Sequence, residues 1–204
     1  MLKDISTAMP GRIHATTARS SDSLRDHFLL AMPCLTEGIF SHSITYICEH
    51  GESGAMGIVI NQPLDLSVGE IFEHLQIDSL RDFSEMPVMA GGPVQIDHGF
   101  VLHRGSEGSW EASLKVTDEI TLTTSRDILR SIAHGSGPKE HLIALGYAGW
   151  SAGQLEQELA ENSWLSVPAD SEIIFATPAE QRLGNAAAQL GIDMNLISGE
   201  AGHA

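Results

Sequence analysis

Residues 146–156 read GYAGWSAGQLE, where an apolar run meets a glycine-rich turn and then the start of a helix. The run from His141 to Ala148 has the composition of a buried strand. We expect Ser151 to cap the helix and the side chain of Gln154 to reach back to the N–H of the capping residue. The serine then has a structural task, and the other polar side chains of the stretch offer no catalytic set.

The length and composition are those of a globular protein. The chain has 204 residues, of which 42% are hydrophobic, enough for one domain with a core. Residues 1–24 lack periodicity, so we expect a flexible N-terminal tail followed by a single domain over residues 25–204. The tail lacks the apolar stretch of a signal peptide, and no run approaches the roughly 18 residues of a membrane helix. With only two cysteines, the sequence predicts a cytoplasmic protein with no membrane association.

The charge balance is strongly acidic. Eleven lysine and arginine residues stand against 27 aspartate and glutamate residues, a formal net charge of −16. The cations are scattered from Lys3 to Arg182, and the only helical pair, Arg126 and Arg130, is too small for a phosphate-binding surface. The composition therefore disfavours direct nucleic-acid binding and favours a basic protein partner.

Short strand patterns recur along the chain, bounded by glycine, proline and aspartate. They lie at His27–Met32, His42–His50, Ala55–Asn61, Pro87–Ala90, Gly99–His103, Glu111–Val116, Ile120–Thr123, His141–Ala148, Trp164–Val167 and Glu172–Phe175. The second and third are joined by the turn-forming residues 51–54, which predicts a hairpin, and Pro63 is expected to end its second strand.

Four helix starts follow capping rules. Ser67 with Glu70 forms a capping box, Ser125 and Ser151 are N-cap candidates, and Thr177-Pro178 places a cap before a proline at the first helical position. Because strands arrive in consecutive groups, we expect an α+β (mixed α/β) fold. It consists of a largely antiparallel mixed or barrel-like sheet with about four packed helices.

Six blocks of sequence carry a family resemblance. They are residues 27–33, 54–63, 91–94, 99–103, 122–128 and 146–156. In this order, over about residues 26–202, they resemble the AlgH/YqgE family of bacterial proteins. The resemblance implies a cytosolic one-domain α/β protein whose molecular activity is not established, although some members are labelled transcriptional regulators.

The chain departs from the family pattern at three positions. Gln62 stands where an arginine is common, Ala176 where an acid is common, and Leu183 where a tryptophan is common. If an arginine at position 62 binds an anion in relatives, glutamine can still form a hydrogen bond there but carries no charge.

Three loops at strand ends form the candidate ligand site. Its residues are Asn61, Gln62, Pro63, Gly91, Gly92, Pro93, Tyr147, Gly149 and Trp150. Loops at strand ends are common ligand positions, the two glycines can present backbone N–H groups to an anion, and the tryptophan can supply an apolar wall. The alternative is that Gly-Gly-Pro is only a structural turn. No cofactor is predicted.

The histidines and cysteines allow two further hypotheses. In an unbroken strand His42, Cys48 and His50 share one face, and the last two could share a metal. Zinc needs three or four protein ligands, and no second pair completes the set, so we predict no metal site and treat these as buried or edge-strand side chains. Cys34 with His42 could form a nucleophile and its base, but no third group orients them, which favours a core or loop thiol.

The function that fits these features best is a non-enzymatic cytosolic regulatory or binding protein. It would regulate transcription indirectly, through a small ligand or an unknown protein partner. One alternative is an uncharacterised enzyme with a loop-built pocket near Asn61, Gly91, Gly92 and Trp150. The other is a regulator that binds DNA directly, which the acidic balance disfavours.

Overall fold

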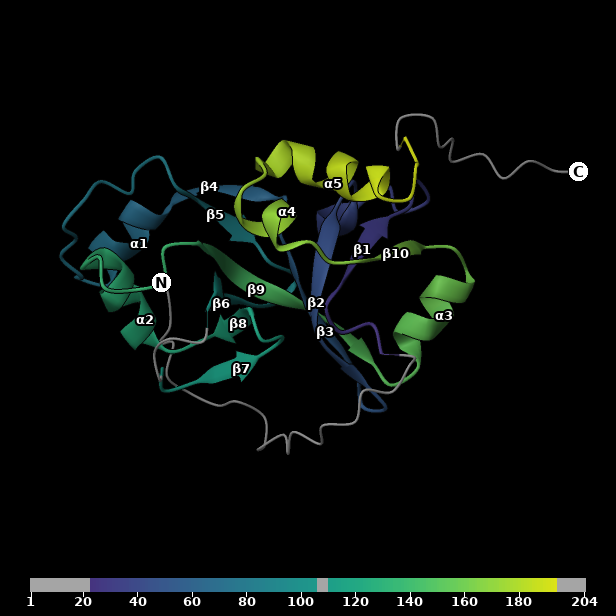
Figure 1. Ribbon diagram of the computed structural model, residues 1–204, viewed down its shortest axis with the longest axis horizontal. Coiled ribbons are helices and arrows are strands. Elements are labelled where there is room, and N and C mark those ends of the chain that lie inside the picture. The colour runs from purple at the N-terminus through teal and green to yellow at the C-terminus, as the bar shows by residue number, and fades with distance from the viewer. Residues whose placement is uncertain (1–22, 106–109, 194–204) are drawn as a thin grey trace, which may run out of the picture.

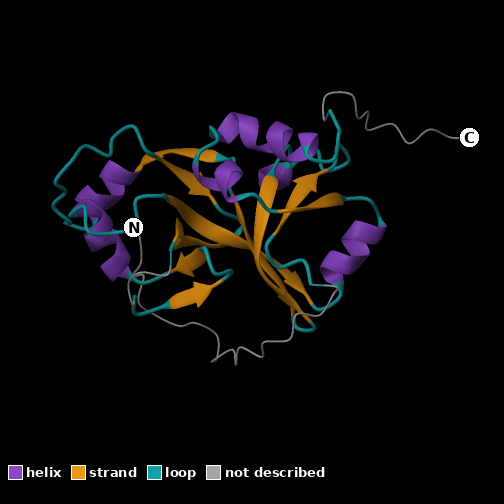
Figure 2. Cartoon of the chain, in the orientation of Figure 1, coloured by secondary structure: helices purple, strands orange, loops and turns teal. Residues whose placement is uncertain are grey.

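The strand-forming segments assemble into one curled ten-stranded sheet bordered by helices (Figures 1 and 2). The computed structural model describes residues 23–105 and 110–193. Of the predicted tail, only Ser23 and Leu24 lie inside these ranges.

The strands are β1 (His27–Ala31), β2 (Ile44–Gly51), β3 (Gly54–Val59), β4 (Pro63–Ser67), β5 (Pro87–Ala90), β6 (Val94–Arg104), β7 (Ser113–Lys115), β8 (Ile120–Thr123), β9 (His141–Ser151) and β10 (Trp164–Pro168). The helices are η1 (Gly38–Phe40), a 3-10 turn, and α1 (Val68–His74), α2 (Arg126–Ala133), α3 (Gln154–Ala160), α4 (Ser171–Phe175) and α5 (Ala179–Ala188).

The sheet is mixed and largely antiparallel. Its strand order is β10-β1-β2-β3-β9-β6-β8-β7, and β4 joins it through β5, which pairs with β9. The β5–β9 pair is parallel, and the other ladders are antiparallel. The expected α+β fold with a barrel-like sheet is confirmed, as is the hairpin of β2 and β3.

Three apolar clusters fill the spaces between the sheet and its helices. The interior of the curled sheet, with Phe28, Tyr46 and Leu102 fully buried, is covered by α4 and α5. A second cluster packs α1 and α2 on one outer face, and a third packs α3 on the other side of the molecule (Figure 1). Among the described helices none is both long and apolar enough to cross a bilayer.

Two backbone segments cross at van der Waals distance in the middle of the sheet. Strand β5 pairs with one edge of β9, and β6 pairs with the other edge, so residues 91–93 must pass over β9. A Cβ atom on Gly92 would lie 2.0 Å from the carbonyl carbon of Tyr147, and one on Gly146 would lie 2.4 Å from the carbonyl oxygen of Gly92. Glycine is therefore required on both segments for the crossing to form.

Gly146 also reverses which face of the sheet successive side chains of β9 point to. Its φ of +74° interrupts the alternation of the strand, as in a β-bulge. Before it, Ala144 packs in the interior and Leu145 against the α1–α2 cluster; after it, Tyr147 packs in the interior and Ala148 against the α3 cluster. One strand thus serves all three apolar layers.

Local capping corrects two predictions, since the N-cap of α5 is Pro178 and not Thr177, and the predicted cap of α3 is also wrong. The capping box of Ser67 and Glu70 at the start of α1 is confirmed. For α3 the N-cap is Gly153, in the left-handed region, and Ser151 is the last residue of β9 instead. The Gln154 side chain still accepts a hydrogen bond from the Ser151 N–H at 3.0 Å, so at α3 only the capping serine was wrong.

One predicted strand is a helix, and one predicted strand boundary is wrong. Residues 172–175 belong to helix α4, because the Asp170 carboxylate accepts the N–H of Glu172 and starts a helical turn. Their adjacent isoleucines, which suggested a buried strand, both face the interior from that turn. Pro63 begins β4 and does not end β3, which stops at Val59.

Replacing Gly146 with alanine is expected to destabilise the protein more than replacing Gly135. Both have φ near +70°, but a Cβ at position 135 has no neighbour within 4 Å. Gly135→Ala should cost about 1–2 kcal/mol for the left-handed backbone, and Gly146→Ala about 2–5 kcal/mol because overpacking against Gly92 is added. Urea unfolding of both variants tests this; equal losses of stability would contradict the crossing.

Candidate functional site

The crossing brings the three predicted loops together through their backbones. The Ala90 N–H donates to the carbonyl oxygen of Gln62 at 2.7 Å, and the Val59 N–H donates to that of Gly91 at 2.8 Å. The Gly91 N–H donates to the carbonyl oxygen of Leu145 at 2.8 Å. Much of the polar backbone at this junction is therefore already paired within the fold.

Glycines and proline of the second loop differ in exposure. Gly91 and Gly92 are buried, whereas Pro93 is exposed. The buried glycines serve the crossing, so a ligand at this junction can reach the proline edge more readily than the glycine N–H groups.

The amide side chains of the loop at residues 61–63 hydrogen-bond to the start of β2 and the residues before it. Asn61 accepts the Ile44 N–H through Oδ1 at 2.9 Å and donates through Nδ2 to the carbonyl oxygen of His42 at 2.9 Å. Gln62 donates through Nε2 to the carbonyl oxygen of Ser41 at 3.0 Å. Its Oε1 has no protein partner in the part of the chain that the structure describes, and it is the free acceptor of this loop. Pro63 next to it is exposed.

A buried arginine lies behind this loop and was not predicted. Arg182 of α5 is 8% exposed; it donates through Nε to the carbonyl oxygen of Thr177 at 2.9 Å and through Nη1 to that of Ile60. Burial lowers the pKa of Arg182 to about 10. An arginine on an amphipathic helix reads as solvent-facing, so the sequence carried no signal of this position.

The third loop divides between two faces of the sheet. The Tyr147 ring lies 5.5 Å from that of Phe100 on the interior side. Trp150, 6% exposed, packs 6.0 Å from Trp164 in the α3 cluster, and both indole N–H groups donate to Oε2 of Glu158. The structure thus gathers residues 61–63, 91–93 and Tyr147, and leaves Trp150 on the other face, with the exposed Gly149 between them.

Cys48 and His50 do not share a face, contrary to the prediction from strand parity. A bulge between Ile47 and Glu49 shifts the register, so Cys48 points into the interior and His50 lies opposite Ala55 in the α3 cluster. Burial raises the pKa of the Cys48 thiol, which keeps it protonated.

The ring of His50 is held by two neighbours. Its Nδ1 accepts the Leu24 N–H at 2.9 Å, and its Nε2 lies 2.9 Å from Oε1 of Glu156. This accounts for both nitrogens, so the ring ties the start of the described chain to α3 and has no free metal-binding atom.

The other thiol and histidine are also separate. Cys34 is exposed, with its Sγ 3.8 Å from the carbonyl oxygen of Asn162, while Nδ1 of His42 contacts the Ser41 hydroxyl at 2.9 Å. Within residues 23–105 and 110–193 no three metal-ligating side chains gather.

Two histidines, the buried His103 and the half-buried His141, face each other across β6 and β9. His103 is directly opposite His141, and its Nε2 lies 3.0 Å from the Thr123 hydroxyl. His141 donates through Nδ1 to the carbonyl oxygen of Pro138 at 2.9 Å, which leaves Nε2 as a buried acceptor without a partner. Burial lowers the pKa of both side chains, so both are neutral at pH 7.

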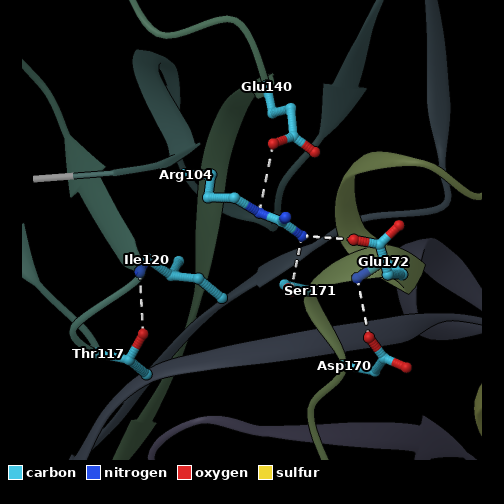
Figure 3. A network of polar contacts seen from close by, with 7 residues as sticks. All are labelled: Arg104, Thr117, Ile120, Glu140, Asp170, Ser171 and Glu172. Atoms are coloured by element: carbon cyan, nitrogen blue, oxygen red, sulfur yellow. Dashed lines mark hydrogen bonds and ion pairs between the residues drawn. The ribbon is translucent and has the colours of Figure 1, made fainter.

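A polar network joins β6 to α4 (Figure 3). Arg104 donates through Nη2 to Ser171 Oγ and to Glu172 Oε1, both at 2.8 Å, and its Nε lies 3.4 Å from Oε2 of Glu140. The hydrogen bond to Glu172 contributes most to raising the pKa of Arg104. The carboxylates are largely exposed, so each pair adds little stability, and the network positions α4 over the interior.

Comparison with known proteins shows which family this chain belongs to. Residues 28–195 match the DUF179 family model, described as AlgH-like. A UPF0301 protein of Saccharophagus degradans is 57% identical over 182 residues, covering 89% of each chain. One of Thioalkalivibrio sulfidiphilus is 56% identical over 185 residues, covering 91% of this chain and 99% of the other.

Two solved structures share the fold. The solution structure of the AlgH protein from Pseudomonas aeruginosa has a TM-score of 0.74 and 46% identity, covering 93% of this chain and all of that one. The crystal structure of protein DIP2367 from Corynebacterium diphtheriae has a TM-score of 0.67 at 17% identity, covering 90% and 95%. The second likeness concerns the fold alone.

The lowered pKa values of His103 and His141 predict that stability falls as the pH drops below about 6.5. The unfolded chain then binds protons that the folded chain rejects, at up to about 1.4 kcal/mol per pH unit for each histidine. Urea unfolding at pH 7.5 and 5.5 should show a smaller loss for a His103→Gln/His141→Gln double variant than for wild type. The exposed His134→Gln serves as control; equal losses in the double variant and wild type would contradict the assignment.

Proposed function

Because the chain belongs to the AlgH-like DUF179 family, whose activity is not established, we propose a function from its own charges and contacts. It is a cytoplasmic regulatory or binding protein without enzymatic activity, and it affects transcription indirectly by binding a basic protein partner. The observation that carries this proposal is the use of arginines inside the fold, together with the net charge of −16.

Three arginines of the described residues are engaged by groups of the same chain. Arg25 donates through Nε to the carbonyl oxygen of Val116 at 2.8 Å and through Nη2 to that of Lys115. Arg104 binds α4 and Arg182 binds the end of β3, as described above. The Lys115 ammonium lies 2.8 Å from Oδ1 of Asp118.

Four of the eight lysines and arginines in the described residues are therefore already paired within the chain. Nucleic-acid binding needs several lysines or arginines free on one surface, since each phosphate contact releases counterions. Carboxylates outnumber cations among the charged groups that remain on the surface. Such a field attracts a positively charged protein and repels a polynucleotide, which supports the partner hypothesis over direct DNA binding.

A salt series separates these two functions. We expect the purified protein to retain no duplex DNA above background at 50 mM salt, and to associate with a basic protein whose affinity falls between 50 and 200 mM salt, because the attraction is screened. Electrophoretic mobility shifts and cross-linking with mass spectrometry measure the two. Sequence-specific, salt-sensitive DNA retention by the purified chain would overturn the proposal.

We further propose that the junction of the three loops, with Gln62, Pro63, Pro93 and Tyr147, binds a small ligand. Supporting this, Gln62 Oε1 is a free acceptor beside exposed proline surfaces. Since Gln62 carries no charge and the two glycines are buried, a neutral ligand with a hydrogen-bond donor fits better than an anion.

A thermal-shift screen of cytoplasmic metabolites tests this site. A ligand at 100 times its dissociation constant stabilises the protein by about 2.7 kcal/mol, which raises Tm by several degrees. The same compound should not stabilise Gln62→Ala, whose side chain lies in a surface loop. A stabilising compound that acts equally on both proteins, or a screen without one, would contradict the site.

A further inference from the structure

An open pocket lies between α1 and the loop that follows it. Its volume is about 170 Å³, and its lining includes Phe72, Glu73, Ile77, Asp82 and Phe83. Small-molecule pockets have roughly 300–1,000 Å³. This one is therefore of a size to accept one side chain, and its apolar base and acidic rim suit a side chain with an apolar stem and a charged end.

Two of the carboxylates at the rim, those of Glu70 and Asp82, are fixed in place. Glu70 accepts the N–H and the hydroxyl of Ser67 at 2.8 and 2.9 Å, and Asp82 accepts the Ser84 N–H at 2.8 Å. These hydrogen bonds lower the pKa of both acids, so they stay ionised. Residues 70–85 hold five acids and one arginine, Arg81, whose guanidinium lies 4.9 Å from the centroid of the Phe83 ring, so the surround of the pocket is negative overall.

An exposed leucine lies beside this pocket. Leu80 is 77% exposed, the highest value among the exposed large apolar side chains of the described chain. It follows Ser79 and precedes Asp82, both of which line the pocket. Leu80 thus places an apolar side chain next to the acidic pocket, where one partner segment can contact both.

We propose that the pocket and Leu80 form an acidic docking surface for a basic segment of a partner protein. The segment inserts a lysine or arginine side chain between Glu73 and Asp82 and lays a neighbouring apolar residue on Leu80. This deepens the proposed function, because it rests on the partner's being a basic protein and names the surface that receives it.

Charge and position select this occupant. A second copy of the chain carries the same negative field and is repelled, and a small anion is excluded for the same reason. The stem of a lysine or arginine matches the walls of Phe72 and Ile77, while its cation meets the rim. The surface lies at the end of the molecule away from α3 (Figure 1).

The experiment uses a defined probe, the peptide acetyl-Leu-Arg-Leu-Arg-amide, titrated into the ¹⁵N-labelled full-length chain. We expect saturable amide shifts concentrated in residues 69–84. Glu73→Lys and Leu80→Ala should each weaken binding at least about fivefold, which corresponds to roughly 1 kcal/mol. Both side chains are exposed, and dispersed spectra confirm that the variants fold.

Matched variants separate the surface from the general acidity of the protein. Glu52→Lys makes the same charge change in the β2–β3 turn, and Leu190→Ala removes another exposed leucine, at the end of α5. Both should change the affinity less than about twofold. Equal weakening by Glu52→Lys and Glu73→Lys, or shifts centred outside residues 69–84, would overturn the inference.

The outcome is independent of the proposed function's own test. A failed peptide experiment leaves the salt-dependent partner assay standing, because that assay does not depend on which surface is used. If the peptide binds as expected but the salt series finds no basic partner, the proposed function is overturned and the docking surface is still supported.

Discussion

The close approach of the backbone at Gly92 and Gly146 is the constraint on which the rest of the structure depends. It lets β9 pair with β6 on one edge and with β5 and then β3 on the other. The left-handed conformation of Gly146 also turns the second half of the strand over, so that one strand contributes to all three apolar clusters. A side chain at either glycine would overpack against the crossing segment and weaken the junction of the two halves of the sheet.

The fold uses three of its arginines to link the sheet to distant segments, and this affects which charges remain on the surface. Arg25, Arg104 and Arg182 each link elements far apart in the sequence: the start of β1 to β7, β6 to α4, and α5 to the end of β3. These cations satisfy carbonyl and carboxylate oxygens of their own chain. The surface is left acidic. An acidic surface contributes more to specificity among partners than to binding affinity.

Local rules in the sequence predicted the hairpin of β2 and β3 and the capping box of α1, because both depend on residues within a few positions. They missed α4, although its cap is local: the Asp170 carboxylate accepts the Glu172 N–H, and the adjacent isoleucines suggested a strand instead. The bulge that separates Cys48 from His50 has no local signature. For the candidate site, strand ends predicted which loops meet, but not that the glycines are buried by the crossing or that a pocket forms beside α1.

Native-state hydrogen exchange at Val59, Ala90 and Gly91 tests the central claim most directly, because these three amides donate across the junction of the crossing strands. If the crossing is the constraint we describe, all three exchange only by global unfolding, with the free energy measured by urea denaturation. Exchange of these amides through a local opening, at a free energy several kcal/mol below the global value, would show that the halves of the sheet separate independently and would contradict the account.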